Sequence, residues 1–245
     1  LVEVSPAETR VAVLDESGDL LEFRVDRINA KSLVEGVYRG RVVWVEKGLD
    51  AAFLDIGVGE NVFLNRPGKV HEGQSITVQV SRNAGGGKPP QVRKRVEIAG
   101  RFAVYLPNER GIRWPANLKS GRRRQVLEAA FAESAEMDEG WSLRSQSARA
   151  DIELIRSEMS RLKSLWAKIG STQDQAPKCV LAPPSMLERM LRDRGADGSV
   201  IVDDRMTLLD LEKKRAAGEI EGLDDLLFHD EREPLFDAYG VNDGL

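Results

Sequence analysis

The chain has 245 residues, of which 41% are hydrophobic and 31% charged, and its formal net charge is −4. This composition is ordinary for a globular protein, and the length allows one to three domains. No apolar run approaches the roughly 18 residues of a membrane span, and the first residues lack the basic start and apolar core of a secretory signal. The single cysteine, Cys179, excludes an internal disulfide and fits a reducing cytosol, so we expect a cytoplasmic protein. With two histidines, a His-based metal site is not expected.

Charge is distributed unevenly along the chain. Residues 36–125 carry 17 Lys and Arg against 7 Asp and Glu, whereas residues 200–245 carry 5 basic against 13 acidic residues. A basic segment of this size suggests a polyanionic ligand. Chance variation of surface charge stays open as the alternative.

The first predicted elements are β-strands. Residues 8–25 predict a hairpin, with a turn at residues 15–19. Between residues 36 and 64, three short apolar runs with a period near two are broken by glycines. Further strands are predicted at 75–80 and 92–98, joined by a loop rich in glycine and proline.

Beyond residue 100 helices and strands alternate. We expect strands at 101–106 and 140–145 and a helix over 122–136. The strongest helical pattern covers 148–169, where apolar residues recur at spacings of three and four. These residues are Ile152, Ile155, Met159, Leu162, Trp166 and Ile169.

The last part of the chain has a clear helix start. Ser185 with Glu188 forms a capping box that opens a helix ending at Gly195. Strands are predicted at 178–182 and 199–203, and a helix at about 206–217. An acidic tail, in which no strand is predicted, covers 219–245.

The strand-rich block has the residues of a barrel that stacks nucleic-acid bases. Alternation places Phe53 and Asp55 on one face of their strand, opposite Ala52, Leu54 and Ile56. The face that carries Asp55 is the wetter one, which favours a surface position for Phe53, although a core position is the alternative. The candidate stacking residues are Tyr38, Phe53 and Phe63, and the candidate phosphate contacts are Arg39, Arg41, Lys88 and Arg93.

Three other groups of residues are weaker candidates for a binding or metal site. Arg144 and Ser145 combine a charge with a hydroxyl, which can hold a terminal phosphate, although such pairs are common. The basic triplet 122–124 opposes the helix dipole and is either a phosphate contact or a solvated helix start. Asp203 and Asp204 are either a metal pair or, more commonly, a helix N-cap. We assign no catalytic residue and no metal ligand in this chain.

Several segments resemble, in order, the bacterial ribonuclease E/G endoribonucleases. The opening strand and the barrel block are similar, as are the strand after the glycine loop, the segment around Gly100 and the acidic end. These segments are residues 8–14, 37–42, 51–57, 62–64, 73–80, 98–108 and 233–239.

The resemblance implies an α+β fold. An S1-like OB β-barrel, residues 36–92, would be inserted in an RNase H-like α/β subdomain of residues 1–35 and 179–245. A mixed α/β 5′-sensor subdomain would occupy residues 93–178. Matching motifs place the RNA contacts of the family at Phe53, Phe63 and Lys88, and its monophosphate sensor at Gly100, Val104, Arg144 and Ser145. Ser145 stands where the best-known members have threonine, and the loop between Phe63 and Gly73 is shorter than theirs.

The catalytic aspartates of the family lie in motifs that this chain does not contain, and its zinc-linking Cys-x-x-Cys is absent. The resemblance therefore implies single-stranded RNA as the partner, Mg²⁺ in the full-length enzyme but no cofactor in this chain, and homo-oligomerisation through a missing C-terminal part. The chain is then a piece of a longer enzyme or a non-catalytic RNA-binding regulator. An assembly protein whose basic face meets an acidic partner is the third alternative.

Overall fold

The computed structural model describes residues 1–132, 138–170, 176–194, 198–220, 223 and 225–242. The fold is mixed α/β with a closed five-stranded barrel, which confirms the expected α+β class. The chain forms two compact units, one of residues Leu1–Ser32 and Ser185–Leu245 and one of residues Leu33–Pro184.

The first unit contains a five-stranded sheet of order β15-β14-β1-β2-β3. β2 and β3 form the antiparallel hairpin that the sequence predicts, and β1 pairs antiparallel with β2. β14 runs parallel to both β1 and β15. The strands are β1 (Val2–Val4), β2 (Glu8–Leu14), β3 (Leu20–Arg27), β14 (Val200–Val202) and β15 (Leu226–Phe228), and the short 3-10 helix η1 (Ile28–Ala30) follows β3.

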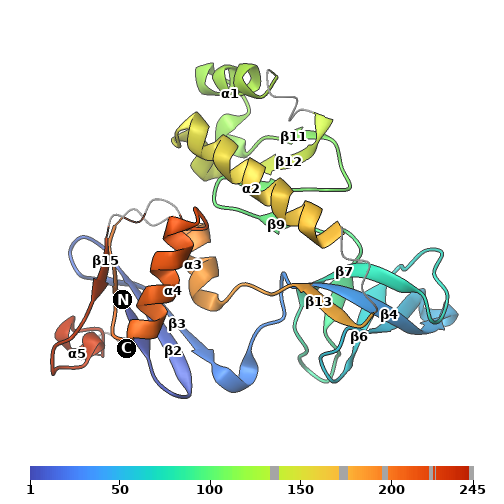
Figure 1. Cartoon of the computed structure of the whole chain (residues 1–245), viewed down its shortest axis with the longest axis horizontal. Coiled ribbons are helices and arrows are strands. Elements are labelled where there is room, and N and C mark those ends of the chain that lie inside the picture. Colours follow the sequence, from blue (N-terminus) through green and yellow to red (C-terminus); the bar gives the residue numbers. More distant parts are fainter. Residues whose placement is uncertain (133–137, 171–175, 195–197, 221–222, 224, 243–245) are drawn as a thin grey trace. The chain divides into compact units, whose positions relative to one another are not determined.

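Helices cover both faces of this sheet (Figure 1). On one face, Val11 and Val202 pack against Leu187 and Leu211 of α3 (Met186–Arg194) and α4 (Arg205–Ala216). On the other face, alternate strand residues such as Ala12 pack against α5 (Leu235–Ala238). Alternation of side chains along each strand is what allows one sheet to serve two apolar layers.

The capping residues of α3 act as the sequence predicts. The backbone N–H of Ser185 donates to Glu188 Oε2 at 2.6 Å, and the N–H of Glu188 donates to Ser185 Oγ at 3.1 Å. α3 reaches Arg194, and the predicted end at Gly195 lies outside the described residues.

The acidic tail, in which the sequence indicates no strand, does contain one. β15 pairs with β14 through three residues, and α5 buries Phe236. A three-residue strand gives no readable alternation, and pairing with β14 and burial supply the stability that the local sequence does not show.

The barrel of the second unit closes through pairing of its first and fourth strands. β13 (Lys178–Leu181) continues the edge of β4 on which β5 pairs, and the two strands lie side by side in Figure 1. Leu54, Val62, Leu64, Val78 and Val80 are among the residues that fill the interior. The barrel strands are β4 (Val37–Glu46), β5 (Ala51–Asp55), β6 (Asn61–Asn65), β7 (Ser75–Arg82) and β8 (Gln91–Arg93), with the 3-10 helix η2 (Lys47–Leu49) between β4 and β5.

The rest of the second unit is a four-stranded sheet of order β11-β12-β10-β9, on which α2 packs. Its strands and helices are β9 (Ile98–Ala99), β10 (Ala103–Tyr105), β11 (Gly111–Arg113), η3 (Ala116–Leu118), α1 (Arg122–Ala132), β12 (Gly140–Leu143), η5 (Ser145–Ala148) and α2 (Ile152–Gly170).

The predicted apolar stripe of α2 is confirmed, since Ile155, Met159 and Leu162 are at most 1% exposed. The predicted helix over 122–136 is α1 as far as Ala132, and its last residues lie beyond the described part. The strand predicted over 92–98 is instead two strands, β8 and β9.

In the described part of the chain, no helix combines the length and apolar character that crossing a membrane requires. The same residues contain no cluster of three or more His, Cys, Asp or Glu side chains suited to a metal ion.

Candidate nucleic-acid interface

Three aromatic side chains form a row across adjacent barrel strands. Trp44 of β4 is the cross-strand partner of Phe53 of β5, which is in turn the partner of Phe63 of β6. The Trp44 and Phe53 rings are stacked, with centroids 4.1 Å apart and planes 19° apart, and Phe53 meets Phe63 edge to face at 5.6 Å. On its other side Phe63 pairs with Gln91 of β8, where the aromatic side chains end. We call Trp44, Phe53 and Phe63 the aromatic row.

The aromatic row lies on the outer face of the barrel. Phe53 and Phe63 are half-buried, and Trp44 is 38% exposed. Their neighbours along the strands, among them Ala52, Leu54, Val62 and Leu64, are at most 2% exposed and fill the interior. Phe53 thus shares the wetter face with Asp55, as strand alternation predicts.

Trp44 is the member of the aromatic row that sequence reasoning missed. Simple alternation places Trp44 on the same face as the buried Val42. The pairing of β4 with β5 shifts between these two residues, because Val42 opposes Leu54 whereas Trp44 opposes the next residue, Phe53. Val43 is therefore an extra residue, and this β-bulge turns Trp44 outward. No feature of the local sequence marks the bulge.

The expected stacking role of Tyr38 does not fit its position. The side chain is 4% exposed and belongs to the barrel core, since it faces the interior together with its cross-strand partner Val78 and with Val42. Burial raises the pKa of its hydroxyl to about 12, and the hydroxyl hydrogen-bonds with Cys179. A base cannot reach this ring while the core is closed.

Three of the four predicted phosphate contacts already have partners within the second unit. Arg39 donates to Thr77 Oγ1 at 2.8 Å, and Arg41 donates to the carbonyl oxygen of Ala176 at 2.7 Å. Arg93 donates to Glu97 Oε2 at 2.8 Å and to Gln79 Oε1 at 3.1 Å. These arginines link barrel strands to one another and to residues that follow the barrel in the chain. Arg39 and Arg93 are half-buried, and Arg41 is exposed.

Lys88 and several other exposed cations of the barrel have no such partners. Among the described residues, their side chains form no hydrogen bond or ion pair, which leaves the charges available to an anion. This group, which we call the unpaired cations, comprises Lys47, Arg66, Lys69, Arg82 and Lys88.

The strand register places unpaired cations beyond both ends of the strand segments that carry the aromatic row. Lys47 and Arg66 directly follow Glu46 and Asn65, which both pair with Ala51 at one end. β8 runs parallel to β6, so Lys88, three residues before Gln91, lies towards the other end. Lys47 and Arg66 each follow a residue of the aromatic row by three positions, and Lys88 precedes Gln91, the partner of Phe63, by three. Three positions correspond to a distance on the order of 10 Å along the strand.

The four predicted sensor residues are brought together by β9, β10 and β12. Arg144 Nη1 donates to the carbonyl oxygen of Gly100 at 2.8 Å, and the backbone N–H of Arg144 donates to the Phe102 oxygen at 2.8 Å. Val104 is half-buried and pairs with Ser142, two residues before Arg144. Ser145 is exposed at the first position of η5, and its hydroxyl has no hydrogen-bond partner among the described residues.

A buried carboxylate supports this group. Glu158 of α2 is 3% exposed, and its two oxygens accept the backbone N–H groups of Arg101, Phe102 and Ala103 at 2.6, 2.8 and 2.9 Å. Sequence reasoning missed Glu158. This acid is three residues after Ile155 and four before Leu162, so helical spacing places it on the apolar stripe, where a polar side chain indicates a buried polar contact.

In the other two candidate groups, Arg123, Arg124, Asp203 and Asp204 have structural roles. Arg124 lies over the Trp114 ring at 4.8 Å and pairs with Glu128, and Arg123 donates to the Ser147 and Ala150 oxygens. Asp204 caps α4 by accepting from the Thr207 N–H at 2.7 Å, as the N-cap alternative predicts. Asp203 accepts from the Val4 N–H at 2.8 Å, and burial raises its pKa.

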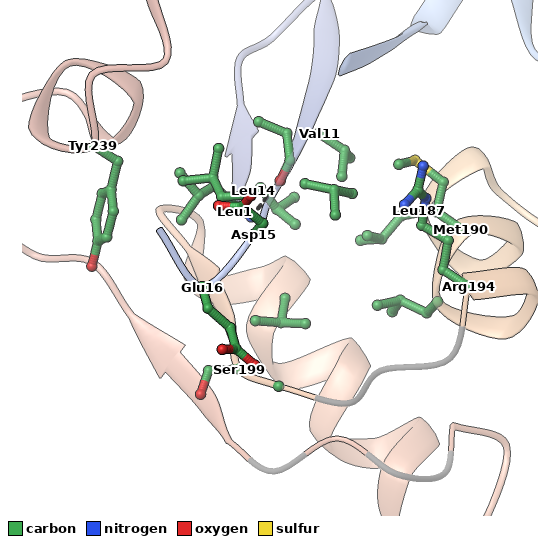
Figure 2. Close-up of a pocket in the computed structure, with 16 residues that line it drawn as sticks. Leu1, Val11, Leu14, Asp15, Glu16, Leu187, Met190, Arg194, Ser199 and Tyr239 are labelled. Atoms are coloured by element: carbon green, nitrogen blue, oxygen red, sulfur yellow. Dashed lines mark hydrogen bonds between the residues drawn. The ribbon is translucent and has the colours of Figure 1, made fainter. Parts of the chain in front are cut away.

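The first unit has a cavity of ≈ 370 Å³ between its sheet and α3, with a mainly apolar lining. Figure 2 shows side chains of β2 and α3 facing this cavity, with Asp15, Glu16 and Arg194 nearby. None of the predicted site residues lines it.

A closed five-stranded barrel with an outer aromatic row and nearby unpaired cations is typical of nucleic-acid-binding proteins built on an OB-type fold. Comparison with known proteins narrows this class. Residues 97–245 match the model of the Ribonuclease E/G family. The chain belongs to this family.

Ribonucleases G and E are among the relatives of the chain. It is 25% identical to Ribonuclease G of Haemophilus influenzae and 27% identical to Ribonuclease G of Salmonella typhimurium, covering 100% of this chain and 55% of each relative. Ribonuclease E of Buchnera aphidicola subsp. Acyrthosiphon pisum is 24% identical over 96% of this chain and 29% of that protein. The chain thus spans about half the length of the ribonuclease G relatives.

Proposed function

We propose that this chain is the RNA-binding and 5′-monophosphate-sensing part of a ribonuclease E/G-type endoribonuclease that acts on single-stranded RNA in RNA processing and decay. The observation that carries the proposal is the aromatic row with unpaired cations towards both ends of its strands, in a chain of this family. In this proposal residues 36–92 are the S1-like barrel and residues 93–178 the 5′ sensor.

The geometry favours unpaired over paired nucleotides. Half-exposed rings on an outer sheet face bind bases by stacking, and in a duplex the base faces are covered by the neighbouring base pairs. The unpaired cations, whose side chains have no partner among the residues that the structure describes, are suited to the phosphates on either side of a stacked base. The barrel surface therefore favours a single strand without requiring a particular sequence.

The sensor proposal rests on Arg144 and Ser145. The Gly100 carbonyl oxygen fixes one nitrogen of the Arg144 guanidinium, and the Ser145 hydroxyl lies on the next residue. A guanidinium and a hydroxyl hold a terminal phosphate through charge-assisted hydrogen bonds that a 5′-hydroxyl end cannot form.

The resemblance implies Mg²⁺ for the hydrolytic step of the full-length enzyme. In this proposal the metal is held by aspartates outside this chain. We assign this chain the tasks of binding and orienting RNA, and hydrolysis to residues outside it. Assembly into a homo-oligomer and a cytoplasmic location belong to the same proposal.

The test measures binding of the chain to a labelled RNA of about 12 nucleotides, within the site size of an OB fold, by fluorescence anisotropy. We expect binding to the single strand, weaker binding to the matching duplex, and affinity that falls with salt at a slope near −0.7 per phosphate contact. The absence of RNA binding at low salt would contradict the proposal and favour an acidic protein as the partner of the basic surface.

A further inference from the structure

The outer end of the aromatic row is the most accessible part of the barrel interface. Of the four tryptophans, Trp141 is fully buried, Trp114 and Trp166 are half-buried, and only Trp44 is exposed. One face of its indole is stacked on Phe53. Because Phe53 also contacts Phe63 and is itself half-buried, Trp44 offers the larger accessible aromatic surface.

We propose that Trp44 is a base-binding residue, and that the outermost nucleotide on the barrel stacks on the indole face turned away from Phe53. The inference rests on the proposed function and adds a subsite to it. A base on Trp44 would extend the existing Trp44–Phe53 stack by one ring.

The position of Trp44 is fixed by the backbone. The bulge at Val43 makes Trp44 the direct cross-strand partner of Phe53, and its ring is held in a near-parallel stack with planes 19° apart. A ring that is already ordered loses little conformational entropy when a base stacks on it, which favours binding.

A charge lies within reach of this subsite. Lys47 is the third residue after Trp44 and has no hydrogen bond or ion pair among the described residues. Arg66 is at the same end, because its N–H donates to the Asp50 oxygen at 2.8 Å in the loop that follows Lys47. A nucleotide stacked on Trp44 thus has cations near its phosphate.

The experiment compares wild type with W44A, W44F and V43A in binding the same single-stranded RNA by anisotropy. Val43 is the matched control, because it is an apolar neighbour with 42% exposure. We expect W44A to weaken binding about 5- to 30-fold, the lower part of the range for one base–aromatic stack. W44F keeps a ring and should stay within about 3-fold of wild type, and V43A should bind as wild type does.

A second readout follows the indole directly. A base that stacks on Trp44 quenches the fluorescence of the indole. At RNA concentrations that saturate wild type and W44F, RNA should therefore quench the tryptophan emission of wild type and not that of W44F. Circular dichroism shows whether each variant is folded.

The outcomes separate this inference from the proposed function. Unchanged affinity of a folded W44A, or an equal loss in V43A, would overturn the Trp44 subsite while wild-type RNA binding kept the proposed function. If wild type binds no RNA at low salt, the proposed function itself fails. If W44A is unfolded, the quenching comparison between wild type and W44F decides the question.

Discussion

The carboxylate of Glu158 occupies the space in which any residue other than glycine at position 100 would place its Cβ. An ideal Cβ on Gly100 would lie 2.4 Å from both Cδ and Oε1 of Glu158, closer than real atoms approach. The same carboxylate accepts the next three backbone N–H groups along the chain. The glycine and the acid therefore form one structural unit beneath the proposed sensor.

Replacing Gly100 by alanine should strongly destabilise the second unit. The carboxylate must withdraw and leave buried N–H groups without an acceptor, at a cost of about 1–3 kcal/mol for each group left unsatisfied. We expect G100A to lower the free energy of unfolding by about 2–4 kcal/mol in urea titrations followed by tryptophan fluorescence. G85A is the control, since a Cβ at Gly85 meets no atom within 4 Å. Equal stability of G100A and wild type would contradict this packing.

The ionisation of Tyr38 should reveal that the barrel is closed. Burial raises its pKa to about 12, from an ordinary value near 10. The folded barrel thus favours the neutral phenol, so the contribution of Tyr38 to stability is fully present below about pH 10 and is lost as the pH rises towards 12. Between these values wild type should lose more free energy of unfolding than Y38F. Absorbance of the phenolate, taken as the difference from Y38F, measures the pKa. A midpoint near 10 in the folded protein would show that the ring is not buried.

Ser145→Ala should reduce any preference for 5′-monophosphate over 5′-hydroxyl ends. The variant removes a hydroxyl that has no hydrogen-bond partner within the described part of the chain, and it leaves the bond between Arg144 and the Gly100 carbonyl in place. Loss of one hydrogen bond to a charged group is worth about 1.5–3 kcal/mol, so the affinity ratio of the two ends should fall at least about tenfold. S145T keeps the hydroxyl and should keep the preference. A wild-type chain that binds both ends equally would end the sensor proposal.

Elements with local signals were predictable from the sequence. The hairpin of β2 and β3 has a polar turn between alternating strands, α2 has a complete apolar stripe, and Ser185 with Glu188 is a readable capping box. The face of Phe53 follows from alternation within β5 alone, because that strand has no bulge between Ala51 and Asp55.

Features set by pairing between distant segments were not predictable. Tyr38 is buried because the barrel closes through β7, far along the chain, so that Tyr38 faces the interior together with its cross-strand partner Val78. Trp44 points outward because of a shift in the register between β4 and β5. β15 exists only as the parallel partner of β14. In each case tertiary pairing overrides or supplements the local pattern.

The affinity of single-stranded RNA for the variants F53A, F63A and F53A/F63A tests the central claim most directly, which is that Phe53 and Phe63 stack on unpaired bases. We expect each single variant to weaken binding by about 1–3 kcal/mol and the double variant to weaken it further. L49A, which changes an exposed apolar residue of η2, should bind as wild type does. Wild-type affinity in a folded F53A/F63A variant would contradict the account.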